Sequence, residues 1–177
     1  MSQAKATFST EHDLNTSEQQ AFWQTVVQDT LATADGVMLA YMMVKHPQAH
    51  TAIVLSSGRV ESYLKYQELI FDLYQQGYSV YAIDHRGQGL SDRMTINPHM
   101  GHVRRFNDYI DDFALFMQKI VLPQNDKQLM LLGHSMGGAI GTLYLKQHPD
   151  IFTAAAFSAP MYGIKLPMPK VRALVSQ

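Results

Sequence analysis

A short apolar run that ends in a serine between glycines constrains this chain more than any other feature of its sequence. Residues 129–132 are all apolar, the sequence GHSMGG follows at 133–138, and a helical pattern continues beyond it. The pattern Gly-x-Ser-x-Gly predicts a nucleophile elbow, a sharp strand-to-helix turn that exposes a serine hydroxyl in a strained backbone conformation. Ser135 is therefore predicted to be a nucleophile. A Cβ atom would collide where backbone meets backbone in such a turn, which explains its glycines, Gly133, Gly137 and Gly138.

The composition of the chain excludes several classes of function. Its 177 residues suffice for one domain with a sizeable core. A net charge of −1 gives no reason to expect binding to nucleic acid. The absence of cysteine from the sequence excludes disulfides, a thiol nucleophile and metal ligation by thiolate, and it fits a reducing compartment.

Neither a signal peptide nor a membrane span is predicted. Residues 1–18 are polar and lack the apolar core of a signal peptide. Residues 128–145 contain no Lys, Arg, Asp or Glu, and their length alone would suit a membrane span. They also contain several glycines and the polar residues Gln128, His134 and Thr142, so we interpret them as a buried strand followed by a helix.

Strand and helix patterns alternate along most of the chain. A helix is predicted over 16–29, followed by a hairpin of strands 31–34 and 37–44 that turns at Asp35-Gly36. Further buried strands are predicted at 51–55, 78–83, 129–132 and 153–157. Helical spacing predicts the intervening helices at 62–76, 107–122 and 136–147. This alternation predicts an α/β fold, a mostly parallel sheet with helices on both faces in a three-layer sandwich.

Two glycine-rich loops follow predicted strands, but neither fits a nucleotide site. The glycines of the elbow have P-loop spacing, yet Ala-Ile at 139–140 stands where lysine and a hydroxyl residue would hold phosphate and magnesium. The loop Gly87-x-Gly89 lacks the third glycine of a dinucleotide fingerprint, because Asp92 occupies that position. The sequence therefore predicts no nucleotide cofactor.

Two backbone N–H groups are candidates for an oxyanion hole, which stabilises the charge of a tetrahedral intermediate in serine chemistry. The residue after the nucleophile supplies one N–H, and here it is Met136. A loop after an early strand supplies the other, and Gly58-Arg59 follows the strand at 51–55. Gly58 could alternatively be a simple turn glycine. With the elbow downstream, the N–H of Arg59 is predicted to be the second donor.

The elbow and the sequence DHRGQGLS at 84–91 together resemble the α/β-hydrolases of the monoacylglycerol lipase and lysophospholipase group. The sequences GRVESY at 58–63 and PHMGHVRRFNDY at 98–109 resemble the bacterial lysophospholipases associated with the inner membrane. The sequence APMYG at 159–163 resembles the entry into the cap over that family's active site. The resemblance covers residues 50–177, about three quarters of the chain.

The resemblance implies an α/β-hydrolase core at 31–160, after an N-terminal polar segment and helix at 1–30 and before the start of a cap at 161–177. It implies that Ser135 attacks the acyl carbonyl of a lipid-like ester, a lysophospholipid or a monoacylglycerol, without cofactor or metal. A cytoplasmic location is implied, with peripheral association at the inner membrane left open. The residues implied to shape the site beside the elbow glycines are Gly58, Asp84, Gly87, Gly89 and His134.

The acid and base that would activate Ser135 are not identified in this chain. In this fold they follow the serine, with Asp or Glu first and His later. After Ser135 the sequence contains one acid, Asp150, and one histidine, His148, which come in the reverse order. Helical rise places both roughly 20 Å from the serine. The resemblance implies that the true acid and base lie beyond the cap, in sequence that this chain does not contain.

Upstream polar residues near the predicted site are interpreted as structural. His134 adjoins the serine, but the elbow turns its side chain elsewhere, so it is predicted to be structural. His85 follows a neighbouring strand and could approach the mouth of the site, although a loop-ordering role is favoured. Asp84 is predicted to accept N–H bonds from its own glycine loop. Ser57 and Val60 replace the histidine and the second glycine of the lipase pattern His-Gly-x-Gly. That replacement leaves the backbone role of Arg59 intact.

Two further clusters were candidates for chemistry. His99-x-x-His102 has no third ligand nearby in sequence, so no metal site is predicted. Asp108, Asp111 and Asp112 are interpreted as a solvated helix start that the helix dipole favours.

Three functions remain open from the sequence. The first is acyl-ester hydrolysis by a chain that ends as the cap begins. The second is a non-catalytic, truncated remnant that binds acyl chains or a partner. The third is an acyltransferase or another esterase built on the same elbow, since a fold does not fix the substrate. An incomplete sheet is expected to expose an apolar edge at its last strand.

Overall fold

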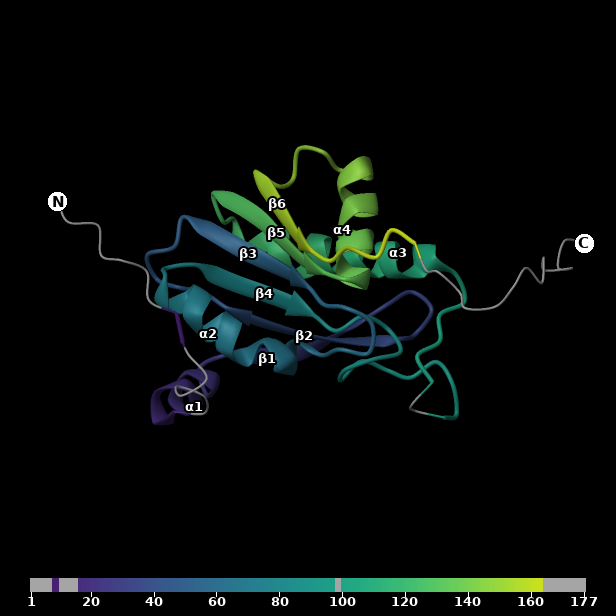
Figure 1. Cartoon of the computed structure of the whole chain (residues 1–177), viewed down its shortest axis with the longest axis horizontal. Helices are drawn as coiled ribbons and strands as arrows, with labels where there is room; N and C mark the ends of the chain where they lie inside the picture. Colours follow the sequence, from purple (N-terminus) through teal and green to yellow (C-terminus); the bar gives the residue numbers. More distant parts are fainter. Residues whose placement is uncertain (1–7, 10–15, 98–99, 164–177) are drawn as a thin grey trace, which may run out of the picture.

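Six strands in the described part of the chain form one sheet between two layers of helices (Figure 1). The computed structural model describes residues 8–9, 16–97 and 100–163. The pairs β1–β2 and β2–β4 are antiparallel, whereas β4, β3, β5 and β6 run parallel, so the predicted, mostly parallel α/β sheet is confirmed. Across the sheet, the strands are β1 (Val27–Ala32), β2 (Met38–Val44), β4 (Ser79–Ile83), β3 (Thr51–Ser56), β5 (Gln128–His134) and β6 (Ala154–Ser158).

Alternate residues of the central strands face opposite helical layers, because successive side chains of a strand point to opposite faces. On β3, Val54 packs in the cluster that includes residues of α3 (Phe106–Phe116) and α4 (Met136–Gln147). Its neighbour Leu55 packs in the cluster that includes residues of α1 (Ser17–Trp23) and α2 (Gln67–Gln75). Figure 1 shows the two helical layers on the two faces of the sheet, which confirms the three-layer arrangement.

The N-terminal helix is shorter than predicted. α1 ends at Trp23, and Val27 already pairs with Met43 in the antiparallel ladder of β1 and β2, so the prediction of a helix to residue 29 is wrong. β-Branched residues at 25–27 favour an extended chain, and pairing with β2 satisfies the backbone there. The predicted hairpin turn at 35–36 is confirmed, with Gly36 at φ 84°.

The second and third helices contain irregular turns. A 3₁₀ turn, η1 (Tyr63–Tyr66), precedes α2, and the side chain of Ser62 caps it by accepting from the N–H of Leu64. α3 continues into a π-helical turn, η2 (Met117–Val121), and a 3₁₀ turn, η3 (Leu122–Gln124). The elbow helix α4 has the predicted extent.

The acidic start of α3 differs from its predicted character. Asp108 and Asp112 are 5% and 2% exposed, and only Asp111 of the three acids is exposed to solvent. The prediction of a solvated cluster is therefore wrong. Arg105 is the N-cap, and the backbone N–H of Arg105 donates to Asp108 across 3.3 Å.

The last strand lies at the edge of the described sheet. β6 pairs only with β5, and its three alanines, residues 154–156, are exposed, so the expected apolar edge is confirmed. Among the described residues, no helix is long and apolar enough to cross a membrane. Residues 1–7, 10–15, 98–99 and 164–177 lie outside the described residues, so the cap expected at 161–177 stays a prediction.

Candidate active site

Ser135 lies between the end of β5 and the first residue of α4, in a backbone conformation that few side chains adopt. Its φ and ψ are 50° and −115°. Backbone hydrogen bonds hold this conformation, since the N–H of Ser135 donates to Ser158 across 3.0 Å and its carbonyl accepts from Met161 across 2.9 Å. Strained residues persist where the surrounding structure determines them in this way, and they gather at functional sites. The geometry is that of the predicted elbow.

The elbow glycines lie where no side chain fits. A Cβ on Gly137 would collide with the backbone carbonyls of Ser56 and Ser57, at the end of the neighbouring strand β3. A Cβ on Gly133 would lie 2.8 Å from the ring of Phe157, and one on Gly138 would lie 2.9 Å from Pro160 (Cβ). The turn therefore packs directly against β3, β6 and the segment after β6.

The predicted oxyanion loop lies beside the elbow. Ser56 of β3 pairs with Gly133 of β5, so the segment that follows each strand emerges at the same edge of the sheet. We define residues 58–61 as the oxyanion loop. The N–H of Gly58 donates to Glu61 (Oε2) across 2.7 Å, and the N–H of Val60 donates to Gln88 (Oε1) across 3.0 Å.

Two N–H groups at this edge remain without a partner among the described residues. The N–H of Arg59 lies between the two paired N–H groups of the loop and has no acceptor in the described chain. Met136 is the first residue of α4, and the first N–H groups of a helix have no acceptor within the helix. No acceptor for the N–H of Met136 is found among the described residues either. These are the two groups that the sequence predicts as oxyanion donors.

His134, the residue before the serine, contacts the oxyanion loop. Its Nδ1 lies 3.1 Å from Glu61 (Oε2) and 3.2 Å from the hydroxyl of Tyr66. Burial raises the pKa of Glu61, but hydrogen bonds from Lys65, Tyr66, His134 and the Gly58 N–H outweigh it and lower that pKa to about 2. The contact connects the elbow with the oxyanion loop, in line with the structural role predicted for His134.

Asp84, directly after β4, organises the glycine loop that follows. Its carboxylate accepts from the N–H of Leu90 across 2.8 Å and from the N–H of Tyr63 across 2.6 Å, so its predicted bond to its own loop is confirmed. Burial raises the pKa of Asp84, and this effect exceeds the lowering caused by these hydrogen bonds. Gly89 has φ 56°, and a Cβ there would collide with the Asp84 carboxylate. Gly87, at φ 78°, passes close to the backbone of His102.

His85 is fully buried and contacts the end of β3. Its Nε2 lies 3.0 Å from the hydroxyl of Ser56. Burial lowers the pKa of His85 to about 4, so the ring is neutral near pH 7. Its Nδ1 and the hydroxyl of Ser57 are buried without a partner in the described chain. The ring therefore joins two strand ends beneath the site, which fits an ordering role.

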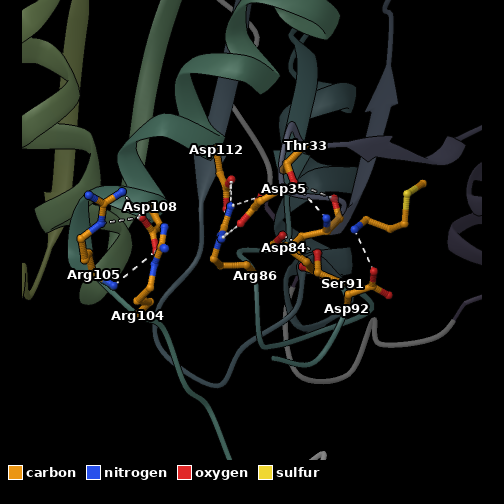
Figure 2. A network of polar contacts seen from close by, with 12 residues as sticks. Thr33, Asp35, Asp84, Arg86, Ser91, Asp92, Arg104, Arg105, Asp108 and Asp112 are labelled. Atoms are coloured by element: carbon orange, nitrogen blue, oxygen red, sulfur yellow. Dashed lines mark hydrogen bonds and ion pairs between the residues drawn. The ribbon is translucent and has the colours of Figure 1, made fainter. Parts of the chain in front are cut away.

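A buried ion pair that was not expected from the sequence lies beneath the glycine loop (Figure 2). Arg86 donates to Asp112 from Nε and Nη2, each across 2.6 Å, and to Asp35 from Nη1 across 2.9 Å. These hydrogen bonds hold the pKa of Arg86 above its usual value, and the hydrogen bond to Asp112 has the largest effect. The hydrogen bond from Arg86 also lowers the pKa of Asp35 to about 2. An arginine in the loop just after a buried strand is the one sequence signal for this pair.

No base for Ser135 is found among the described residues, where no histidine is hydrogen-bonded to its hydroxyl. His148 and Asp150 are both exposed, beyond the far end of α4. Within residues 8–9, 16–97 and 100–163, no group of three or more His, Asp or Glu residues could hold a metal ion. His99 lies outside those ranges.

Solved structures with the same arrangement define the class of this fold. A carboxyl esterase from Bacillus coagulans superposes with a TM-score of 0.65 at 18% identity, over 75% of this chain and 44% of that one. The α/β hydrolase domain-containing protein 10 from mouse superposes with a TM-score of 0.59 at 16% identity, over 74% of this chain and 48% of that one. The chain has the α/β-hydrolase fold.

Sequence comparison narrows the class to a family. The family model described as "Serine aminopeptidase, S33" matches residues 47–177, and the chain belongs to this family. Lysophospholipase L2 of Escherichia coli K12 is 43% identical over 152 residues, which cover 86% of this chain and 45% of that protein.

More distant relatives agree with this assignment. The probable lysophospholipase L2 of Haemophilus influenzae is 36% identical over 160 residues, which cover 89% of this chain and 50% of that protein. Monoglyceride lipase of Mus musculus is 32% identical over 134 residues, which cover 74% of this chain and 42% of that enzyme. The chain spans about half the length of the curated relatives it matches. The resemblance to lysophospholipases and monoacylglycerol lipases is confirmed.

Proposed function

We propose that this chain carries the nucleophile and the oxyanion hole of a hydrolase of lipid acyl esters. One observation carries the proposal: the strained Ser135 lies beside two N–H groups, of Arg59 and Met136, that no described residue accepts from. Relatives named lysophospholipase and monoglyceride lipase support lysophospholipids or monoacylglycerols as the substrates. The core at 31–160 and a cap that begins at 161 are part of the proposal.

The proposed reaction begins at the hydroxyl of Ser135. Its Oγ forms a bond to the ester carbonyl carbon, and the π electrons of the carbonyl move onto oxygen. The N–H groups of Arg59 and Met136 donate to that oxyanion, an interaction for which each donor contributes about 10²- to 10³-fold in rate. The intermediate collapses by breaking the bond to the alcohol oxygen, which leaves with the serine proton. Water then releases the fatty acid and restores the serine.

The proton acceptor in this reaction is left unassigned. Serine needs a neighbouring base to be a good nucleophile. No described histidine is bonded to Ser135, and this observation favours a second candidate, a non-catalytic domain that binds acyl chains. A third reaction, transfer of the acyl group to an alcohol instead of water, would use the same residues.

Contact with a lipid surface is a further part of the proposal. Lysophospholipids and monoacylglycerols reside in membranes, so the site must approach one, and we place the protein at the cytoplasmic side of the inner membrane. Leu90, Ile96 and Met100, on the loop after β4, are exposed apolar side chains suited to such contact. Co-sedimentation with phospholipid vesicles tests this step, and a protein that stays in the supernatant contradicts it.

Labelling with a fluorophosphonate separates the candidates. Wild-type protein should gain one adduct on Ser135, S135A should gain none, and S158A should label like wild type, because Ser158 bonds the elbow through its backbone carbonyl, which alanine keeps. Untreated wild-type protein is then given lysophosphatidylcholine or monoacylglycerol, with fluorophosphonate-treated protein as the blank, and released fatty acid is measured with and without an alcohol acceptor. Folded wild-type protein that never labels supports the binding domain. Labelling of a chimera completed with the later half of the E. coli relative would then place the missing base outside this chain.

A further inference from the structure

We propose that Gln88 is a positioning residue that holds the oxyanion loop in its active shape and selects which N–H faces the substrate. Gln88 lies in the glycine loop after β4, and its side chain is 5% exposed. It contacts neither Ser135 nor a reacting atom in the proposed reaction. Its catalytic consequence rests on the proposed function, whereas its effect on the loop does not.

The amide of Gln88 makes three hydrogen bonds to the loop. Its Nε2 donates to the carbonyls of Gly58, across 2.7 Å, and Glu61, across 3.1 Å. Its Oε1 accepts from the N–H of Val60 across 3.0 Å. The side chain of Gln88 thus forms hydrogen bonds with the backbone of three of the four loop residues, and it uses both of its N–H donors and its carbonyl acceptor.

The loop contains a strained residue that local sequence does not favour. Val60 has φ 59°, which is an outlier for a β-branched residue. Its side chain is 66% exposed, so burial does not compensate for the strain. Position 60 carries glycine in the lipase pattern His-Gly-x-Gly. The hydrogen bond from Val60 to Gln88 therefore holds a conformation that glycine would adopt without help.

The same contacts leave one donor free. The carboxylate of Glu61 accepts from Gly58, Gln88 accepts from Val60, and the N–H of Arg59 between them has no acceptor in the described chain. The N–H of Arg59 shares a peptide unit with the carbonyl of Gly58, and the N–H of Val60 shares one with the carbonyl of Arg59, so a rotation of either unit would change which N–H is free. Because Gln88 accepts from Val60 and donates on either side, it opposes that rotation and preorganises the free donor.

Gln88 is itself held in place. Its N–H donates to the carbonyl of His85 across 3.2 Å, and its carbonyl accepts from the N–H of Ser91 across 3.1 Å. Gly87 before it has φ 78°, and Asp84 fixes the far end of the same loop through the N–H of Leu90. Because Gln88 is fixed in the glycine loop, its three side-chain hydrogen bonds hold the oxyanion loop in a defined position relative to the glycine loop.

Both functions of the amide are needed for this role. Q88M keeps the length of the side chain and removes the donors and the acceptor. Q88E keeps an acceptor for Val60, but it loses both donors and places a carboxylate against two carbonyl oxygens. Q88M and Q88E are therefore both expected to loosen the loop. The matched control is Q19M, because Gln19 is also buried, at 7% exposed, and bonds Ser9 beside α1, away from the site.

Two measurements on the whole chain test the proposal. Amide hydrogen exchange at residues 58–61 should become at least tenfold faster in Q88M and Q88E and remain unchanged in Q19M. Saturation kinetics of fluorophosphonate labelling should show a maximal rate about 10- to 100-fold lower with little change in probe affinity, because a misplaced oxyanion donor affects the transition state.

Each outcome decides the question. Unchanged exchange at residues 58–61 in Q88M overturns the inference, and so does a faster exchange with an unchanged labelling rate. If wild-type Ser135 is not labelled, the proposed function fails, and the exchange measurement alone then decides whether Gln88 holds the loop. A uniform rise of exchange across the sheet in Q88M, matched by Q19M, would show general destabilisation and also overturns it.

Discussion

Arg86 and Asp112 form a bidentate ion pair in the interior, with both hydrogen bonds at 2.6 Å and side chains only 5% and 2% exposed. The arginine belongs to the loop after β4, and the aspartate belongs to α3 (Figure 2). The pair fastens the loop that carries Gln88 to the helical layer. Because both charges are desolvated, each depends on the other.

The first prediction concerns removal of the aspartate. D112A should lower the free energy of unfolding by about 3 kcal/mol, because it leaves Arg86 buried with only the half-exposed Asp35 as partner. Urea unfolding followed by circular dichroism measures the loss. D111A, one residue earlier on the same helix and exposed, should change stability by less than about 0.5 kcal/mol. Equal losses in the two variants would contradict the assignment.

The error at α3 shows what local sequence leaves out. Acids in a first helical turn are explained by the helix dipole, but of the three acids Asp108 alone lies in the first turn of α3, and Asp111 lies further along on the exposed face. Asp112 can be buried because Arg86, which is 26 residues away in the sequence, donates hydrogen bonds to its carboxylate. Likewise, the helix predicted to residue 29 ends early because β2 offers residues 27–29 a pairing partner. Both outcomes depend on contacts distant in sequence.

The elbow was predictable because its constraints lie within a few residues. The spacing of glycines around Ser135 encodes the turn, and the order of strands and loops placed Arg59 beside it. Gln88 and Glu61 were not predictable in their contacts, since those depend on side-chain directions from two loops. No periodicity signals that a glutamine will bond three backbone groups of another segment.

The second prediction concerns pH and Glu61. Its pKa in the folded protein is about 2, below the ordinary value of 4.5, so its ionised form stabilises the fold. That stabilisation is fully present above about pH 4.5 and is lost as the pH falls toward 2. Urea midpoints of wild type and E61Q should therefore differ most above pH 4.5 and converge below it. A gap that stays constant from pH 6 to about 2.5 would disprove this linkage.

The third prediction concerns the closest backbone contact of the elbow. G137A should lower the free energy of unfolding by about 3 kcal/mol or abolish folding, because the new Cβ meets the carbonyls of Ser56 and Ser57, which cannot move without shifting β3. Thermal and urea unfolding measure the loss. G163A is the control, since no described residue lies within 4 Å of its new Cβ, and it should unfold like wild type. A stable G137A protein would show that the elbow is looser than described.

The fourth prediction concerns the strain at Ser135 itself. Its φ of 50° and ψ of −115° match the first central position of a type II′ turn, which glycine adopts freely and other residues adopt at a cost of about 1–3 kcal/mol. Replacing serine with glycine removes this strain, but glycine also increases the entropy of the unfolded chain, which offsets about 0.5–1 kcal/mol of the stabilisation. S135G should therefore be more stable than S135A by about 1 kcal/mol in urea unfolding.

A matched pair at Ser158 separates strain from a general effect of glycine. Ser158 ends β6 without a positive φ, so S158G should be less stable than S158A by about 0.5–1 kcal/mol, the reverse of the order at Ser135. The same order at both positions would mean that Ser135 stores no strain. The reversed order would show that the fold retains a destabilising serine at this turn, which is expected where a residue is kept for its hydroxyl rather than for stability.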